Sequence, residues 1–428
     1  MYWCRSHSHC FRQPILIFTA SRARNGRHTV STDISKKAII TKGFCFTFMS
    51  MFCGSFILYM MITTVSEYAG SFGASKAVSG LVSSIFLIGE LVTRLLFPKI
   101  LGRLGWKKTI FFSMTAQLTA CCLYFVISNI FLLILIRLVH GFCFGMAASV
   151  VSNTGIYLIP KERYGEGNGI LMTSTSLSVC LGPLFGGIIY EHFGSYGCFI
   201  TAIILAVLMT SGVYLARAPY PDIRPGAASE RKDDLPFLDR FIEKKALAAS
   251  LCIFFCGAAY SCVLSFIRLF GSETGLSDSV SFYFVVYAAV LLFSRPLVGR
   301  LQDRYGDNAV AYPCISMQII SFVLLAFIPG PVTVLIAAAL LALGYGTLNS
   351  VFITIACRRA SGDRIPYATM TYWIGTDLGV GLGPVWLGAV AESFGYIGMF
   401  SAAACVSAVT IPVYILFCHR SAYRGKAD

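Results

Sequence analysis

One stretch of this sequence recurs at a fixed distance along the chain. The charged segment 295–308 (RPLVGRLQDRYGDN) joins two long apolar runs, and a degraded copy of it occupies 94–108. The matched positions, 201 residues apart, are Arg94 and Arg295, Arg103 and Arg304, and Gly105 and Gly306. A repeat at a constant offset predicts that one structural unit occurs twice in the fold.

The same offset continues further along the chain. Gly145 matches Gly346, and the pattern Gly-Pro-x-x-x-Gly-x-x-x-Glu-x-Phe-Gly occurs at 182–194 and again at 383–395. Agreement over roughly a hundred residues is hard to obtain by chance, so the repeat constrains the architecture before any motif is interpreted.

Composition places these two copies in a membrane. Of the 428 residues, 56% are hydrophobic and 13% are charged, and the mean hydropathy is +0.73. A soluble protein usually carries about twice that charged fraction. Apolar runs of about 20 residues are long enough to cross the hydrocarbon core as helices, which satisfy their own backbone hydrogen bonds in lipid. The sequence lacks the alternation of a membrane barrel, so we predict an all-α membrane protein.

The apolar runs number twelve by their spacing. They lie at 44–68, 76–98, 108–128, 130–152, 166–190, 195–217, 244–269, 279–299, 309–328, 331–355, 366–390 and 395–418. Residues 218–243 combine prolines with mixed charge and are typical of a linker. We therefore predict twelve transmembrane helices in two pseudo-symmetric six-helix bundles, 44–217 and 244–418, with cytoplasmic tails at 1–43 and 419–428.

The net charge of +14 follows membrane topology and does not indicate a nucleic-acid surface. Nearly all Lys and Arg lie in alternate loops, and the loops of the opposite side hold Lys76 and Arg268. By the positive-inside rule, both termini are predicted to be cytoplasmic.

The sixteen cysteines are scattered, mostly in apolar runs, and do not suggest a disulfide framework. Cys4, His7, His9 and Cys10 have side chains of metal-binding type, but their spacing fits no standard zinc pattern. We therefore expect no metal site.

The core of the second charged segment, Gly299-x-Leu-x-Asp303-Arg304-x-Gly306, resembles the signature cytoplasmic loop of the major facilitator superfamily of transporters. The resemblance extends over essentially 44–418 and implies that family's twelve-helix fold. In the family this loop acts as a gate latch. The resemblance implies a latch formed by Arg94, Arg103, Gly105, Arg295, Gly299, Asp303, Arg304 and Gly306.

Asp303 gives this latch its physical basis. A carboxylate at the cytoplasmic mouth can accept hydrogen bonds from the N-terminus of a neighbouring helix and pair with a nearby arginine. The family's pseudo-symmetry makes that helix the one that begins after Arg163. The alternative is a tight turn whose charges only set topology. Gly102 stands where the first copy would need its aspartate, so a symmetric latch there is doubtful.

Arg137, followed by Gly141 and Gly145, resembles the Arg-x-x-x-Gly pattern of the family's fourth helix. This implies a role in proton transfer or charge sensing. An arginine inside hydrocarbon needs a partner or water, so a structural ion pair with Glu90 is the alternative.

The string Gly182-Pro183-Leu184-Phe185-Gly186-Gly187 resembles the Gly-Pro-x-x-Gly-Gly motif of antiporter-type exporters. Small residues let helices approach closely and proline bends them, so ordinary helix packing is the alternative reading. The second copy retains Gly383 and Pro384 but has Leu387 in place of the first paired glycine.

Few ionisable groups lie inside the apolar runs. Asp377 lies near the middle of the eleventh run, Glu90 in the second, and Glu67 near the outer end of the first. A carboxyl group in an apolar site takes up a proton more readily than one in water, so these acids are candidate proton carriers. Asp377 is the first candidate. His140, near Arg137, is a further one, and structural pairing or packing is the alternative for each.

A central cavity of the family's type would be lined by aromatic and amide side chains. The candidates are Tyr59, Asn153, Tyr260, Asn349, Tyr372 and Trp373. They suit a solute with both apolar and polar parts.

We therefore expect a monomeric, multi-pass plasma-membrane transporter that exports a small organic compound or drug in exchange for protons. One alternative is proton-coupled uptake of a sugar or small metabolite, and another is a non-transporting receptor or scaffold on the same fold. The sequence contains no nucleotide-binding loop of the type Gly-x-x-x-x-Gly-Lys-Ser/Thr, and we expect neither an enzyme nor a cofactor.

Overall fold

The computed structural model describes residues 38–74, 76–221, 241–328 and 330–419, and Ile39–Asp428 forms one compact unit. Most of the two predicted tails and of the linker 218–243 lies outside the described residues, as do Cys4, His7, His9, Cys10 and the side chains of Lys76 and Arg268. Where the chain is described it is helical and contains no strand.

The helices follow the predicted apolar runs. They are α1 Lys42–Ser71, α2 Lys76–Cys122, α3 Ile130–Leu158, α4 Tyr164–Ala216, α6 Lys244–Thr274, α7 Ser277–Tyr305, α8 Asp307–Phe327, α9 Pro331–Leu341, α10 Thr347–Arg359 and α11 Ile365–Phe417. Between them lie three short 3-10 helices, η2 Leu123–Val126, η3 Lys161–Arg163 and η6 Gly362–Arg364. A π-helical segment, η5 Ala342–Gly346, joins α9 to α10. Across the described residues, nine helical stretches are long and apolar enough to cross a membrane.

Three of the long helices are interrupted at a glycine. The break falls at Gly105 in α2 (φ 72°), at Gly194 in α4 (φ 64°) and at Gly395 in α11 (φ 66°), and Gly306 separates α7 from α8 with φ 91°. Glycine is favoured at these positions because side chains rarely tolerate the left-handed region. Three of the nine stretches therefore each contain two of the predicted runs.

The repeat read from the sequence has a counterpart in the backbone. The segment η3–α4 covers Lys161–Ala216, and η6–α11 covers Gly362–Phe417, so both ends differ by 201 residues. The same offset relates α3 to the stretch from α9 to α10. The glycine breaks also correspond, Gly105 to Gly306 and Gly194 to Gly395. One backbone design thus occurs twice.

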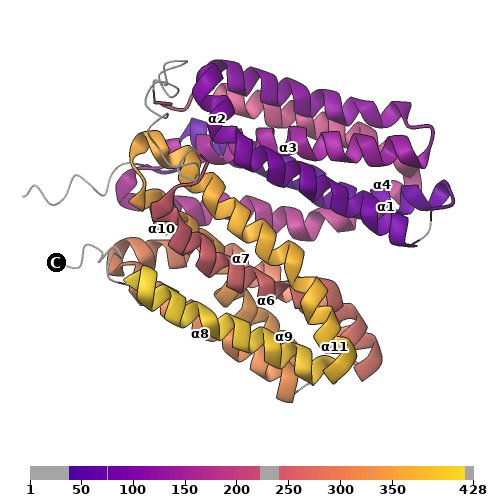
Figure 1. Ribbon diagram of the computed structural model, residues 1–428, viewed down its shortest axis with the longest axis vertical. Coiled ribbons are helices and arrows are strands. Elements are labelled where there is room, and N and C mark those ends of the chain that lie inside the picture. The colour runs from indigo at the N-terminus through magenta and orange to yellow at the C-terminus, as the bar shows by residue number, and fades with distance from the viewer. Residues whose placement is uncertain (1–37, 75, 222–240, 329, 420–428) are drawn as a thin grey trace, which may run out of the picture. The chain divides into compact units, whose positions relative to one another are not determined.

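The helices pack in two groups within this unit (Figure 1). In one group α1 packs along α4 and α2 along α3, and in the other α6 and α8 pack along α11. The groups meet where α4 contacts α7 and α10, and where α2 contacts α11. Residues from both groups can therefore share one site.

Candidate functional site

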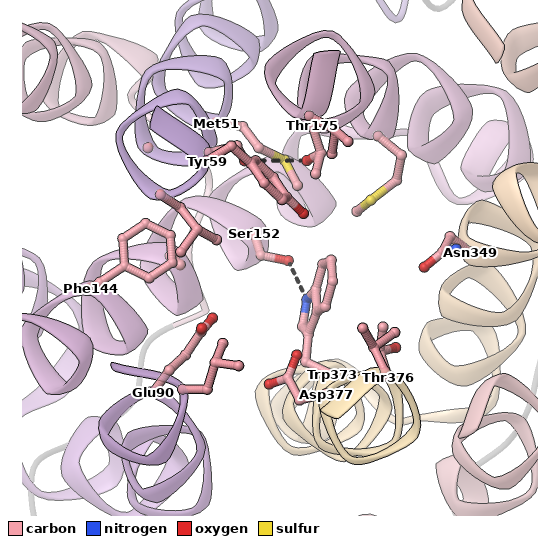
Figure 2. Close-up of a pocket in the computed structure, with 18 of the residues that line it drawn as sticks. Met51, Tyr59, Glu90, Phe144, Ser152, Thr175, Asn349, Trp373, Thr376 and Asp377 are labelled. Atoms are coloured by element: carbon pink, nitrogen blue, oxygen red, sulfur yellow. Dashed lines mark hydrogen bonds between the residues drawn. The ribbon is translucent and has the colours of Figure 1, made fainter. Parts of the chain in front are cut away.

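A cavity of about 550 Å³ lies between the two groups of helices. Four of the six predicted lining residues are on its wall, namely Tyr59, Tyr260, Asn349 and Trp373, together with the acids Glu90 and Asp377. Figure 2 shows Tyr59 on one side of this space and Trp373 and Asp377 on another. The wall is mostly apolar and aromatic with few charged groups, which is typical of a site for small organic molecules.

Asn153 and Tyr372, predicted for this wall, are buried and do not line the cavity. The amide of Asn153 donates to the carbonyl of Ser149 (2.8 Å) on its own helix. The hydroxyl of Tyr372 donates to the carbonyl of Asn349 (2.8 Å), and so supports a residue that does line the cavity. The sequence pattern could not separate them from the lining residues, because helix rotation decides which face meets the cavity.

A largely buried ionic cluster joins the two groups of helices at the cavity wall. Glu90 and Arg94, one turn apart on α2, form an ion pair, and Nη1 of Arg94 lies 2.8 Å from Oδ2 of Asp377 on α11. The contact to Asp377 lacks the alignment of a hydrogen bond. We call Glu90, Arg94 and Asp377 the charge triad; with both acids ionised its net charge is negative.

Trp373 also belongs to this cluster. The guanidinium carbon of Arg94 lies 4.9 Å from the centroid of the Trp373 ring, and the indole N–H donates to Ser152 on α3 (3.3 Å). Figure 2 shows this hydrogen bond reaching across the cavity. This cluster is thus assembled from three helices of the two groups.

Glu90 is not the partner of Arg137, contrary to the alternative drawn from the sequence. Glu90 and Arg94 lie four residues apart and share one helix face, which favours their pairing. Arg137 instead donates to the carbonyl of Val82 (3.1 Å) and the hydroxyl of Tyr124 (3.3 Å).

His140 lies in the same polar core between α2 and α3. Its Nδ1 is 2.9 Å from the hydroxyl of Tyr124, and its Nε2 is 3.2 Å from the amide nitrogen of Gln117. His140 and Arg137 are buried and lie outside the cavity lining. The remaining acid, Glu67, is exposed near the end of α1 and is also separate from the cavity.

Arg295, predicted for the latch, lies at the cavity wall. Its Nε donates to the carbonyl of Gly346 (2.9 Å) and its Nη1 to the carbonyl of Met172. Arg94 likewise lies on the wall and not at the loop. Both precede the loop by about two turns of helix, roughly 12 Å along the axis, which explains why they lie deeper in the protein.

Asp303 meets the N-terminus of α4. Its two carboxylate oxygens accept hydrogen bonds from the backbone N–H groups of Gly165 (2.8 Å) and Glu166 (2.9 Å). Arg358 of α10 forms an ion pair with the same carboxylate and contacts Asp307 (3.1 Å). Three helices from the two groups are held together at this point.

The glycines of this loop allow the helices to touch. A Cβ atom added at Gly299 would lie 2.2 Å from the carbonyl oxygen of Gly165, so α7 and α4 meet backbone to backbone. Gly306 allows the turn into α8. The side chains of Arg304 and of its counterpart Arg103 are exposed.

The first copy of the loop has a different chemistry at corresponding positions. Gly102, Trp106 and Tyr157 stand where the second copy has Asp303, Asp307 and Arg358. The indole of Trp106 stacks on Tyr220 at 4.5 Å and packs edge-on against Tyr157 at 5.5 Å. An aromatic cluster thus replaces the ionic one. The aligned copies of the repeat already contain this difference in residue type.

The Gly-Pro string of α4 packs against α1. A Cβ atom at Gly182 would lie 2.8 Å from the Cβ atom of Tyr59, and one at Gly186 would lie 2.9 Å from the side chain of Met60. Gly187 faces open space, and Pro183 lies inside the helix. This close approach positions the helix that carries Tyr59.

Comparison with known proteins agrees with this architecture. A model of the Major Facilitator Superfamily matches residues 44–384. The multidrug resistance protein MdtG of Dickeya zeae (strain Ech586) is 24% identical over 338 residues, covering 77% of this chain and 81% of that protein. A homologue of the multidrug resistance efflux pump PmrA from Lactococcus lactis is 24% identical over 278 residues, covering 63% and 67%.

Solved structures show the same fold. The human organic anion transporter MFSD10 (TETRAN) has a TM-score of 0.68 at 12% identity and covers 87% of this chain and 98% of its own. The transporter FucP in its outward conformation has a TM-score of 0.66 at 16% identity, with the same coverage. The chain therefore belongs to the Major Facilitator Superfamily and is a multi-pass membrane transporter, not an enzyme.

Proposed function

We propose that this transporter exports a small organic compound in exchange for protons by alternating access. The observation that carries the proposal is the contact of Arg94 with Asp377, because it joins the two halves at the wall of the cavity. A proton on Asp377 removes the charge that attracts Arg94 and weakens the contact. The protonation state of Asp377 is thereby coupled to how strongly the two halves are held together at the cavity wall.

The membrane arrangement proposed is twelve spans in two bundles, 44–217 and 244–418. Helices α4 and α11 have 53 residues each, which as continuous helices would measure about 80 Å, against a hydrocarbon core of about 30 Å. The breaks at Gly194 and Gly395 divide them into lengths that suit one crossing each. We place both termini in the cytoplasm of a plasma-membrane protein that acts as a monomer.

The structure is proposed to represent the outward-facing conformation of the transporter. Hydrogen bonds that join the halves gather toward the end where Asp303 meets α4. Asn168 donates to Thr354 (3.0 Å) and Tyr157 donates to the carbonyl of Gly362 (3.2 Å). These bonds and the Asp303 contacts would have to break for the cavity to open to the cytoplasm.

Two features support export over uptake. The related proteins MdtG and PmrA are named for multidrug resistance and efflux. The cavity wall also combines aromatic rings with a few polar groups, which suits drug-like compounds better than sugars. The proton-coupling groups proposed are Asp377 and Glu90, with Arg137, His140 and Glu67 as the candidates that lie outside the cavity.

The test is transport in reconstituted vesicles of known orientation with an imposed pH gradient. We expect an organic solute to move against its gradient when protons move the other way, and dissipating the pH gradient should stop it. Movement of solute and protons in the same direction would instead establish uptake. Binding without transport under either gradient would favour a receptor and would refute the proposal.

A further inference from the structure

The two copies place an arginine at the same position of the cavity wall, in different electrostatic surroundings. Arg94 and Arg295 correspond in the repeat, and both line the cavity. Arg94 is held by the two carboxylates of the charge triad. Among the described residues, Arg295 donates to backbone carbonyls and forms no ion pair with a carboxylate.

The repeat identifies what is missing around Arg295. The position that corresponds to Glu90 is Leu291, and the position that corresponds to Asp377 is Ser176. Leu291 and Ser176 both line the cavity, so the second arginine has the surroundings of the first without its two acids. Met172, whose carbonyl Arg295 contacts, likewise corresponds to Trp373.

An arginine in this position remains charged. Its guanidinium group does not lose its proton in proteins, and Arg295 is only 6% exposed. A buried charge without a partner of opposite sign is strongly disfavoured, and carbonyl dipoles offset only part of that cost. An anionic group that enters the cavity would therefore pair with Arg295 more strongly than it would pair with an arginine exposed to water.

From this geometry we infer that the transported solute carries an anionic group, a carboxylate, sulfonate or phosphate, which pairs with Arg295. The inference rests on the proposed function and names its substrate class. The planar guanidinium group matches these oxyanions with paired hydrogen bonds. The solute supplies in trans the charge that Glu90 and Asp377 supply to Arg94.

The rest of the wall indicates an apolar body for this anion. Tyr260 stacks on Tyr345 at 4.2 Å between ring centroids and on Tyr287 at 6.0 Å, and all three rings line the cavity. Tyr59 lies on the wall as well. Such a wall binds a hydrophobic or aromatic skeleton, so the substrate class is an amphipathic organic anion.

The test is equilibrium binding to the full chain in nanodiscs of uncharged lipid, at neutral pH and with no gradient. The probes are 1-naphthaleneacetate, its methyl ester, 1-naphthalenemethylammonium and inorganic phosphate, compared by isothermal titration calorimetry. We expect the naphthaleneacetate anion to bind at least about tenfold more tightly than the neutral ester, as for a buried charge pair. An anion that binds no better than the ester, including the case in which no probe binds, overturns the inference. Binding of phosphate alone overturns the assignment of an amphipathic substrate.

Variants test whether the preference for the anion depends on Arg295. Arg295→Gln should abolish the preference for the anion, whereas Arg295→Lys should retain part of it. Ser176→Asp places a carboxylate where the other copy has Asp377, so it should also remove the preference. Ser176→Asn has the same size without the charge, and the difference between the two measures the electrostatic effect. Retention of the preference in both Arg295→Gln and Ser176→Asp would refute the assignment.

The binding experiment and the transport experiment can fail independently of each other. Binding of the anion without proton exchange in vesicles would refute proton-coupled export and leave the inference standing. Proton-coupled export of neutral or cationic compounds alone would do the reverse.

Discussion

The carboxylate of Asp303 on α7 accepts a hydrogen bond of 2.8 Å from the backbone N–H of Gly165, 138 residues earlier in the chain. The same carboxylate accepts a second bond from the next N–H group, so it satisfies two of the unpaired donors at the start of α4. Hydrogen bonds to a charged group contribute about 1.5–3 kcal/mol each, and the helix dipole adds to them. The contact joins the two halves where the proposed inner gate closes.

Asp303→Asn should weaken this gate. The amide retains the size of the side chain but loses the charge that attracts the N–H groups and Arg358. We expect a larger inward-open population and a several-fold lower transport rate with expression largely intact, because hydrogen bonds to charge are about twice as strong as neutral ones. The measurement is labelling of a single cysteine at Thr175, on the cavity wall, from the cytoplasmic side.

Asp278→Asn is the matched control for this experiment. It removes the same charge from the exposed first turn of the same helix. Unchanged labelling and normal transport in Asp303→Asn would show that the loop only sets topology.

Gly299→Ala tests the same contact by size and not by charge. The added methyl group would meet the carbonyl of Gly165 at 2.2 Å, so α7 and α4 would have to separate. We expect reduced transport with increased cytoplasmic access to the cavity, as for Asp303→Asn. Gly70→Ala is the control, since its added atom meets nothing within 4 Å. If the variant transports normally, the close approach of the helices is not needed for closure.

Much of this fold was readable because the repeat fixes it. The offset of 201 predicted the correspondence of Gly105 with Gly306, and the two glycines share one backbone conformation. The family resemblance led to the expectation that Asp303 faces the start of the helix after Arg163, which is where the structure places it. The first relationship needs only the repeat, whereas the second also needs the family's architecture and the chemistry of helix ends.

Other relationships depend on how helices rotate against each other. Arg94 and Arg295 were expected in the latch from the family resemblance, yet both lie at the cavity wall. The suggested pairing of Glu90 with Arg137 was wrong. The four-residue spacing of Glu90 and Arg94 on one helix was the better indication of which residue pairs with Glu90. Contacts between helices far apart in sequence, such as Arg94 with Asp377, follow from packing that no local pattern contains.

The breaks in the long helices predict the sidedness of single cysteines. If α4 is two crossings, cysteines at Glu162 and Ala218 should react with an impermeant reagent from the cytoplasmic side, and one at His192 from the outside. A helix that crossed once would place Glu162 and Ala218 on opposite sides. The test uses a background without reactive cysteines, because several native ones are exposed, including Cys45 and Cys405.

The charge triad gives the last prediction. Asp377→Asn mimics the protonated acid permanently and leaves Arg94 with Glu90 as its partner. If Asp377 carries the coupling proton, accumulation driven by a pH gradient should fall by more than about tenfold, the scale expected when one group of a coupled pair is removed. Substrate binding and passive exchange should survive.

Glu90→Gln provides the comparison within the triad, and His140→Gln tests a candidate that lies outside the cavity. If the acid is needed only as a structural partner of Arg94, the variant should fail to insert stably, because a buried charge would lose part of its compensation. A well-expressed Asp377→Asn protein with unchanged pH dependence would eliminate Asp377 as the coupling group, and the effects of Glu90→Gln and His140→Gln would then decide between the remaining acid and the histidine.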